Sequence, residues 1–342
     1  MDIVVRGEGE YTMLELANYF IRGIGSLGEI RGIAYKSNGR INRTAVRPII
    51  EDLDKLPFPE RDIPDLEGIL NPREGKNVII TSRGCPGKCK FCAASALAGG
   101  KYRMRSVDNI ADEIADFKRN YKDLENIFFG DDTISADVSR LLDLCKMLKT
   151  EDVTWSAESR VDAMTKELAA TLKNSGCLGI QFGVESGSQK LLDSMGKNIT
   201  LEQIIHAVKC AVGAGLGVIC SMMIGLPEDT EETIEQTLDF AERLQTEYKA
   251  GVVLASTVPY PGTYYFRHAD DLNLRISTRN YDQYTTIMPI MDTPHLTRWQ
   301  IRNLYFKAYQ RLNRSLPDAY KNLFITHGAN ALAKAALFDS SN

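Results

Sequence analysis

Three cysteines crowd into eight positions of a chain that holds seven cysteines in all. Cys85, Cys89 and Cys92 have the spacing C-x3-C-x2-C. Thiolates bind soft metals and iron–sulfur clusters, and a cubane cluster normally takes four cysteine ligands. Three local ligands therefore leave one iron open, and an open coordination position is a place for chemistry. Gly84 and Gly87 suit a loop that wraps closely round a bound cluster.

A zinc site, a redox dithiol and a chance grouping are the other interpretations of these cysteines. A structural zinc ion needs a fourth ligand from His or Cys, and the nearest histidine, His206, lies far along the chain. The remaining cysteines are scattered and typical of small apolar core residues: Cys145, Cys177, Cys210 and Cys220. The spacing therefore favours a cluster over the alternatives.

Strand-like and helical patterns alternate from residue 77 onward. The strand candidates are short apolar runs at 78–82, 126–130, 153–157, 178–185, 218–224 and 251–257. Alternating strands and helices predict an α/β fold with a parallel sheet and right-handed crossovers. Six units are fewer than the eight of the usual closed barrel, so the sequence predicts an open, partial (β/α)6 barrel. The cysteines follow its first strand.

Further motifs stand at the predicted strand ends, where parallel sheets place functional residues. They are Phe-Phe-Gly-Asp-Asp (128–132), Gly-Val-Glu-Ser-Gly-Ser (183–188), Met-Ile-Gly-Leu-Pro-Glu-Asp-Thr (223–230) and Pro-Tyr-Pro-Gly-Thr (259–263). Together with C-x3-C-x-aromatic-C after the first strand, they resemble the radical S-adenosylmethionine (SAM) superfamily. The resemblance covers 77–263, and the order of the motifs resembles the subgroup that often carries a cobalamin-binding domain.

The resemblance implies a [4Fe–4S] cluster on Cys85, Cys89 and Cys92, with SAM chelating the fourth iron through its amino and carboxylate groups. An electron from the cluster then cleaves SAM to a 5′-deoxyadenosyl radical. The protein binds and orients the cofactors and excludes water. The resemblance does not identify the substrate beyond a small or lipid-like molecule. The reaction could be C-methylation or an oxidative rearrangement or cyclisation. It also implies a flavodoxin or ferredoxin as reductant.

Roles for the strand-end residues follow from the same resemblance. Gly130, Asp131 and Asp132 resemble the Gly-Gly-Glu motif that meets the methionyl amino group, although two aspartates replace Gly-Glu. Glu185 and Ser186 resemble the position that contacts the ribose hydroxyls. The alternatives are a solvated strand end for the first group and a buried, structurally paired glutamate for the second.

Five further residues complete the implied SAM site. Lys197 resembles the basic residue that meets the methionyl carboxylate, and Arg160 either contacts the cofactor or pairs with a neighbouring glutamate. Phe91 resembles the aromatic residue that shields the cluster. Ile224 and Leu226 would line the adenine site through their backbone. The alternatives are a surface lysine, a hydrophobic plug and plain strand packing.

Segments flank the predicted core on both sides. Residues 1–76 form a leading segment in which 2–10 resemble the last strand and exit of a cobalamin-binding domain, followed by a linker. Residues 264–342 read as a mainly helical extension. The Asp-x-His-x-x-Gly motif of cobalamin-binding domains is absent from the sequence. Cobalamin is therefore expected only if another chain or a missing N-terminal domain supplies it.

Composition excludes several classes of protein. The 342 residues are 44% hydrophobic and 25% charged, which is globular composition. A net charge of −4 gives no general attraction to nucleic acid. The longest uncharged apolar run, 213–227, is too short to span a bilayer, and no signal-peptide pattern opens the chain. The sequence therefore predicts a cytoplasmic protein with no nucleic-acid partner.

Two other functions stay open on the sequence alone. One is an iron–sulfur electron-transfer or scaffold protein with a degenerate SAM site. The other is a tRNA-modifying radical SAM enzyme, which a large excess of Lys and Arg on one face of the C-terminal helices would favour.

Overall fold

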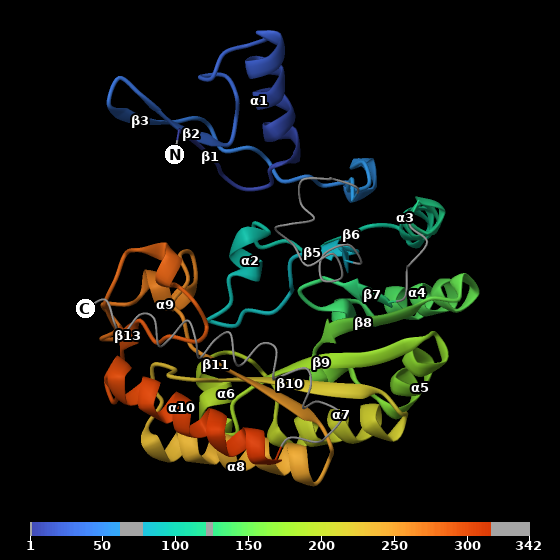
Figure 1. The fold of residues 1–342 in the computed structure, drawn as a ribbon, viewed down its shortest axis with the longest axis vertical. Coiled ribbons are helices and arrows are strands. Elements are labelled where there is room, and N and C mark those ends of the chain that lie inside the picture. The colour runs from blue at the N-terminus through green and yellow to red at the C-terminus, as the bar shows by residue number, and fades with distance from the viewer. Residues whose placement is uncertain (1, 62–77, 121–125, 316–342) are drawn as a thin grey trace.

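A six-stranded sheet forms the centre of the computed structural model, which describes residues 2–61, 78–120 and 126–315 (Figure 1). The strand order is β11-β10-β9-β8-β7-β4, and all neighbouring strands run parallel. The strands are β4 (Val78–Ile79), β7 (Asn126–Phe129), β8 (Thr154–Ser159), β9 (Cys177–Glu185), β10 (Gly217–Ile224) and β11 (Gly251–Ser256). Each falls on a predicted strand segment, so the predicted α/β partial barrel is confirmed.

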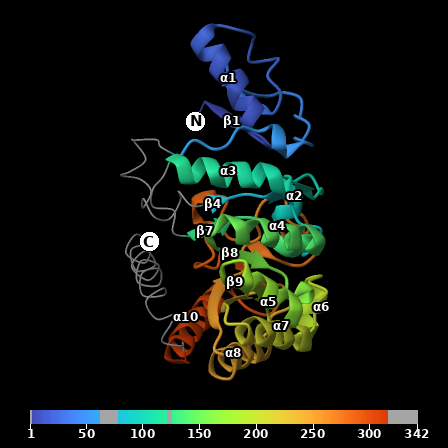
Figure 2. The same cartoon turned by 90° about the vertical axis from the view of Figure 1, so that its right-hand side faces the viewer.

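Helices follow the outer side of this curved sheet (Figures 1 and 2). The helices between and beside the strands are α3 (Val107–Asn120), α4 (Val138–Glu151), α5 (Lys166–Asn174), α6 (Gln189–Ser194), α7 (Leu201–Gly213) and α8 (Glu231–Thr246). A capping box formed by Thr200 and Gln203 begins α7. In the described ranges, no helix combines the length and the apolar character that a membrane crossing requires.

The two faces of the sheet differ in polarity because strand residues alternate sides. On the outer face, Phe129 and Trp155 are fully buried, and their rings meet edge to face with centroids 5.5 Å apart. On the inner face, Glu158, Gln181 and Ser221 are only partly buried. The apolar outer face therefore forms the core with the helices, and the inner face keeps polar groups available.

The N-terminal unit is a small layer of sheet and helix at one end of the molecule (blue in Figure 1). Its sheet is antiparallel, in the order β1-β2-β3. A small core of its own contains Leu16, Ile30 and Ile33. Its elements are β1 (Ile3–Val5), α1 (Glu10–Arg22), β2 (Ile33–Ser37), β3 (Arg40–Arg43) and the single turn η1 (Leu53–Lys55). The predicted linker beyond residue 61 lies outside the described residues.

The C-terminal segment contains one long helix, α10 (Arg298–Ser315), which packs on α8 and β11. Before it come α9 (Tyr264–Arg267), the antiparallel pair β12 (Arg275–Ile276) and β13 (Met291–Asp292), and the turn η5 (Tyr281–Gln283). The predicted helical character thus holds for α10, whereas 268–297 is mostly loop because prolines and turn residues interrupt it. Residues 316–342 of the predicted extension lie outside the described residues.

Candidate active site

The cysteine loop runs from residue 84 to 93, between β5 (Ser82–Arg83) and α2 (Ala94–Leu97). β5 pairs with β6 (Arg103–Met104) above the sheet edge. Two backbone hydrogen bonds hold the middle of the loop: Lys90 N donates to Met195 O at 2.9 Å, and Tyr265 N donates to Lys90 O at 3.3 Å. The end of α6 and the start of α9 therefore fix the loop from two sides.

The three thiols are free and partly buried. The amide of Gly87 donates to Cys85 Sγ at 3.4 Å, and the amide of Ala94 donates to Cys92 Sγ at the same distance. A Cβ at Gly87 would lie 3.3 Å from Cys85 Sγ and 3.9 Å from Cys89 Sγ. Glycine therefore keeps open the space beside two of the sulfur atoms.

Burial raises the pKa of the Cys89 and Cys92 thiols. The positive charges of Lys197 and Arg160 act in the opposite direction on the pKa of Cys89. A thiolate at Cys89 is thus the form that these cations stabilise. Three thiols on one loop, a glycine cradle and two neighbouring cations fit the donor set of an iron–sulfur cluster. Within the described ranges, no three His, Cys, Asp or Glu side chains converge as they would round a single metal ion.

Glu185 and Lys197 form a buried ion pair beside the cysteine loop. Their side chains are each 9% exposed, and Lys197 Nζ lies 2.7 Å from Glu185 Oε1. A Cβ at Gly183 would lie 2.7 Å from both atoms, so the glycine makes room for the pair. Burial lowers the pKa of Lys197, but the charges of Glu185 and Cys89 outweigh burial and raise it overall. Nζ also lies 5.8 Å from the ring centroid of Phe91.

Arg160 pairs with Asp162 rather than with a glutamate. Nε and Nη2 of Arg160 donate to the Asp162 carboxylate at 2.7 to 3.2 Å. Nη2 also donates to Lys197 O at 3.3 Å, and Nη1 would lie 3.5 Å from a Cβ at Gly87. The guanidinium therefore bridges the end of β8, the cysteine loop and the segment after α6.

The two aspartates after β7 have different surroundings. Asp131 is 3% exposed, and its carboxylate accepts four hydrogen bonds of 2.5 to 3.2 Å from the amides and hydroxyls of Thr81 and Ser82. Asp132 is exposed and accepts one hydrogen bond, from Gly84 N at 3.0 Å. Asp131 thus fixes the start of the cysteine loop, and Asp132 keeps capacity for another donor.

Ser186 lies behind Glu185, against α8. It is fully buried, and its Oγ is 3.0 Å from Thr237 Oγ1 of that helix. The next residue, Gly187, comes so close to α8 that a Cβ there would lie 2.6 Å from Gln236 O. Ser186 therefore anchors the loop that carries Glu185.

The turn after β10 is held by a side chain that sequence reasoning missed. Asp229 is 1% exposed and accepts from the amides of Gly225 and Leu226 at 2.8 and 2.9 Å. Thr257 N donates to Ile224 O at 2.8 Å. Burial raises the pKa of Asp229 to about 6. Most backbone polar groups of the predicted adenine-lining turn are thus already bonded within the protein. The sequence signal for Asp229 is an aspartate four positions after Gly225, which has a positive φ in the structure.

Sequence reasoning also missed a set of three polar side chains on the inner face of the sheet. Gln181 Nε2 donates to Glu158 Oε1 at 3.2 Å and to Ser221 Oγ at 2.9 Å. Burial raises the pKa of Glu158, and the charges of Glu185 and Asp132 raise it further. Polar residues at inward positions of three neighbouring strands are the sequence signal for this set.

Two of the cavities among the described residues differ in where they lie relative to the cysteine loop. One of about 490 Å³ lies between the N-terminal unit and the cysteine loop, and Gly7, Glu8, Gly84, Gly130 and Asp132 are among the residues that line it. Glu8 links the N-terminal unit to β5 and β6, because its carboxylate accepts hydrogen bonds from Arg83 at 2.8 Å and from Arg103 at 2.9 Å.

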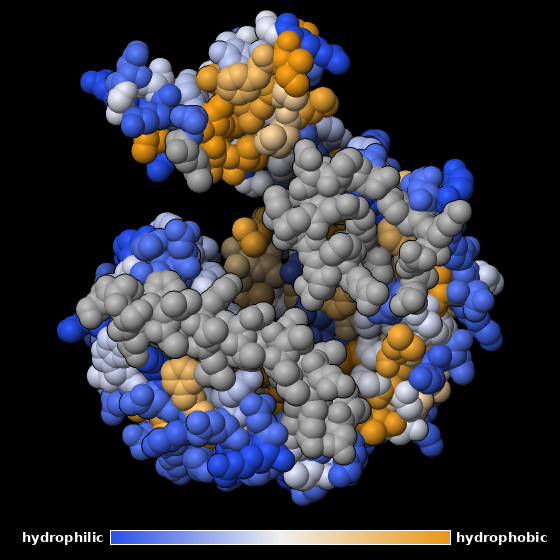
Figure 3. All heavy atoms as spheres, in the orientation of Figure 1, coloured by the Kyte–Doolittle hydropathy of each residue, from blue (hydrophilic) through white to orange (hydrophobic). Residues whose placement is uncertain are grey.

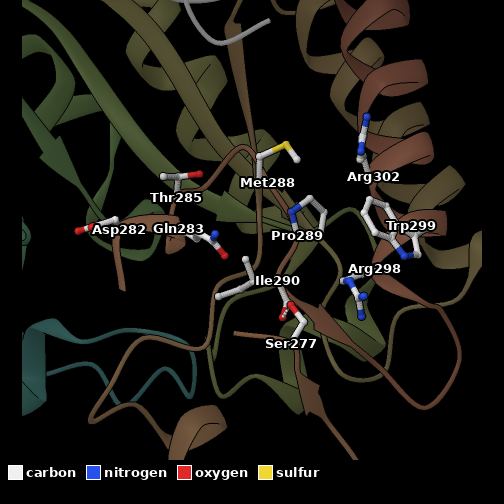
Figure 4. Close-up of a pocket in the computed structure, with 10 residues that line it drawn as sticks. All are labelled: Ser277, Asp282, Gln283, Thr285, Met288, Pro289, Ile290, Arg298, Trp299 and Arg302. Atoms are coloured by element: carbon white, nitrogen blue, oxygen red, sulfur yellow. Dashed lines mark hydrogen bonds between the residues drawn. The ribbon is translucent and has the colours of Figure 1, made fainter. Parts of the chain in front are cut away.

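The other cavity, of about 170 Å³, lies between α10 and the segment 277–290, away from the cysteines (Figure 4). Trp299, Arg298 and Arg302 of α10 form one side of it, and Met288, Pro289 and Ile290 lie opposite. None of the predicted site residues lines it.

The chain is similar in sequence to a known family and to proteins of several organisms. The family profile described as the Radical SAM superfamily matches residues 79–241. A protein named an uncharacterized methyltransferase, from Pyrococcus horikoshii, is 36% identical over 330 residues, which are 96% of this chain and 71% of that protein. The anaerobic magnesium-protoporphyrin IX monomethyl ester cyclase of Rubrivivax gelatinosus is 26% identical over 91% of this chain and 56% of the cyclase.

Solved structures share the fold. The methyltransferase TsrM from Kitasatospora setae, with cobalamin and a [4Fe–4S] cluster bound, superposes with a TM-score of 0.69 at 17% identity, over 93% of this chain and 69% of TsrM. The cobalamin-dependent enzyme OxsB gives 0.59 at 22% identity, over 79% of this chain and 39% of OxsB. The chain thus spans most of the Pyrococcus protein but only about half the length of the cyclase.

Proposed function

We propose that this chain, which belongs to the radical SAM superfamily, holds a [4Fe–4S] cluster on Cys85, Cys89 and Cys92 and cleaves SAM reductively. When bound, the reduced cluster supplies the electron that breaks a C–S bond of SAM and gives the 5′-deoxyadenosyl radical. The observation that carries the proposal is the convergence of the cysteine loop with the Glu185–Lys197 pair at one edge of the sheet.

The residues at this edge offer complementary contacts for SAM. Lys197 is a buried cation suited to the methionyl carboxylate. Glu185 accepts hydrogen bonds and suits the ribose hydroxyls, and Asp132 is an exposed carboxylate suited to the methionyl amino group. Asp131 and Ser186 are positioning residues in this proposal, because their polar atoms are already bonded within the protein.

The remaining predicted contacts shape and shield the site. Phe91 lies beside Lys197 and packs, partly buried, against the core, where its ring would keep water from the cluster. Arg160 places positive charge beside the thiolates. Ile224 and Leu226 give the adenine pocket an apolar wall, whose shape is set by Gly225 at φ +82°.

Methyl transfer is the reaction that the comparisons favour. The Pyrococcus relative, which covers nearly the whole chain, is named a methyltransferase, and the cyclase is a more distant relative. Both reactions begin with the radical cleavage that leaves methionine and 5′-deoxyadenosine, and methyl transfer also leaves S-adenosylhomocysteine from the SAM that donates the methyl group. A small or lipid-like substrate and a flavodoxin or ferredoxin reductant remain part of the proposal.

A corrinoid, if the reaction uses one, would come from another chain or from a further domain packed on the N-terminal unit. The N-terminal unit exposes apolar side chains on α1 and just after its end: Met13, Leu14, Phe20, Ile21 and Ile24, each 55 to 81% exposed. Figure 3 shows an apolar, orange surface on this unit. Such a contiguous face is typical of a covered interface. Equilibrium dialysis of the chain alone against hydroxocobalamin should show no retention, and retention would contradict the need for that domain.

The positive charge of α10 is partly paired within the fold. The helix carries five basic and no acidic residues. Arg311, however, is bound to Glu235, Asp239 and Glu242 of α8, and Arg298 pairs with Asp292. Part of the positive charge is therefore neutralised within the fold.

Anaerobic reconstitution with iron and sulfide tests the proposed function. The wild-type chain should take up four irons per protein, as expected for a cubane, and with dithionite and SAM should release 5′-deoxyadenosine and methionine. Cys89→Ala should lose both the cluster and these products, whereas Cys210→Ala, a cysteine of α7 outside the loop, should keep them. A brown wild-type protein that binds SAM but releases no 5′-deoxyadenosine would refute the proposed cleavage.

A further inference from the structure

The base of the cysteine loop is a short antiparallel pair of strands. β5 and β6 pair over two residues each, and the pair nearer the loop joins Arg83 to Arg103. The segment between these arginines, 84–102, contains all three cysteines of the motif. Its two ends touch, because a Cβ at Gly84 would clash with the carbonyl of Lys101. The pairing of β5 with β6 therefore closes the loop that carries the thiols.

Two like charges face each other at this closure. The side chains of Arg83 and Arg103 are 27% and 5% exposed, and like charges directly opposite in an antiparallel pair are destabilising. Nε and Nη2 of Arg103 are buried and have no hydrogen-bond partner in the described ranges. The charge of Arg103 is therefore balanced only by groups that reach its remaining nitrogen, Nη1.

Glu8 of the N-terminal unit binds both arginines. It lies in the turn between β1 and α1, and its side chain is 11% exposed. Oε1 accepts from Arg83 Nη1 at 2.8 Å, and Oε2 accepts from Arg103 Nη1 at 2.9 Å and from Ile50 N at 2.6 Å. Burial would raise the pKa of Glu8, but the hydrogen bonds from Arg103 and Arg83 outweigh it and lower the pKa to about 2. The carboxylate is therefore ionised at neutral pH.

Glu8 is the one carboxylate that pairs with Arg103 among the described residues. Glu10 also pairs with Arg83, but its side chain is 37% exposed and its recorded ion pair does not extend to Arg103. A buried charge that loses its partner is strongly unfavourable. Without Glu8, the charge of Arg103 would be buried, unpaired and directly opposite Arg83.

We propose that Glu8 is a positioning residue for the cluster, because it neutralises Arg83 and Arg103 and so keeps the base of the cysteine loop closed. The inference rests on the proposed function. Residues 2–61 contain no cysteine, so the N-terminal unit acts on the cluster through the shape of the loop rather than as a ligand. The ability of the loop to retain its cluster then depends on a contact with a separate structural unit.

Glu8→Gln in the reconstituted holoprotein tests this role, with Glu10→Gln as the matched control. Both changes remove one charge at nearly constant size, and both residues pair with Arg83. In excess ferrous chelator, the brown absorbance of the cluster should disappear at least about fivefold faster in Glu8→Gln than in the wild type. The exposed pair contributes little, so Glu10→Gln should stay within about twofold of the wild-type rate.

A charge rescue separates repulsion at the loop base from a general loss of structure. Glu8→Gln combined with Arg103→Gln leaves no unpaired ion there, so the cluster half-life should return to within about twofold of the wild-type value. The EPR spectrum of the reduced cluster should broaden in Glu8→Gln and narrow again in the double variant.

Two results would overturn the inference and leave the proposed function standing. One is a wild-type half-life and EPR spectrum in Glu8→Gln. The other is a double variant that loses its cluster as fast as Glu8→Gln, and this comparison still decides if Glu8→Gln retains no cluster at all. A wild-type protein that assembles no cluster refutes both the inference and the proposed function.

Discussion

The Glu185–Lys197 ion pair allows a sharp test of how the site is built. At 2.7 Å the Coulomb attraction is about 6 kcal/mol for an effective dielectric constant of about 20. Desolvation of both ions offsets much of this attraction, but removing one partner leaves the other charge buried and unpaired. We therefore expect Lys197→Met or Glu185→Gln to lower the free energy of unfolding by about 3–5 kcal/mol.

The double variant should behave differently from either single one. With both charges gone, no unpaired ion is left, so Glu185→Gln with Lys197→Met should lie within about 1 kcal/mol of the parent. The cycle then gives a coupling energy of at least about 5 kcal/mol, well above that of exposed pairs.

Urea unfolding of the cluster-free protein, followed by tryptophan fluorescence, measures these energies. Trp155 is fully buried in β8, and Trp299 is 53% exposed, so a Trp299→Phe background makes the signal report on the sheet. If each single variant lowers the free energy of unfolding by less than about 1 kcal/mol, and the two effects simply add in the double variant, the Glu185–Lys197 pair is not desolvated as argued.

Three further predictions concern neighbouring groups. The pKa of Asp229 is raised from 3.8 to about 6, so the protonated side chain contributes stability below pH 4 that is lost as the pH rises to about 6. Over this range, the free energy of unfolding of the parent, measured relative to Asp229→Asn, should fall by up to about 3 kcal/mol. Gly183→Ala places a methyl group 2.7 Å from both ends of the Glu185–Lys197 pair, and the cycle above, repeated in that background, should show a coupling energy reduced by half or more. Glu158→Gln should weaken SAM binding to the reconstituted protein about tenfold by calorimetry and leave S-adenosylhomocysteine binding unchanged, because only SAM carries the sulfonium charge.

The sheet could be predicted from the sequence because its signals are local. Apolar runs of strand length, helical stripes and the Thr200–Gln203 capping box each depend on residues within a few positions of one another. The cysteine motif is local in the same sense. The strand ends that carry Glu185 and Asp132 followed from the rule that parallel strands end at one edge.

The partners of those residues depend on contacts between distant segments, and the sequence pattern did not define them. Lys197 meets Glu185 only because α6 returns the chain to the end of β9. Asp131 and Asp132 are adjacent in sequence, yet the first is enclosed by Thr81 and Ser82 and the second is open. The direction of a side chain at a strand end, which decides between support and contact, is set by tertiary packing.

The charges round the site are sorted in a way that matches two cofactors of opposite charge. On the side of the cysteine loop, Arg160 and Lys197 stabilise negative charge on the thiolates. On the inner face of the sheet, burial and the negative charges of Glu185 and Asp132 raise the pKa of Glu158, which marks a region that favours a cation. A cluster held by three thiolates is anionic, and the sulfonium of SAM is cationic. One edge of the sheet therefore offers both signs of charge. Cations lie beside the cysteine loop, a carboxylate that favours a cation comes from an inward position of β8, and the Glu185–Lys197 pair joins the two regions.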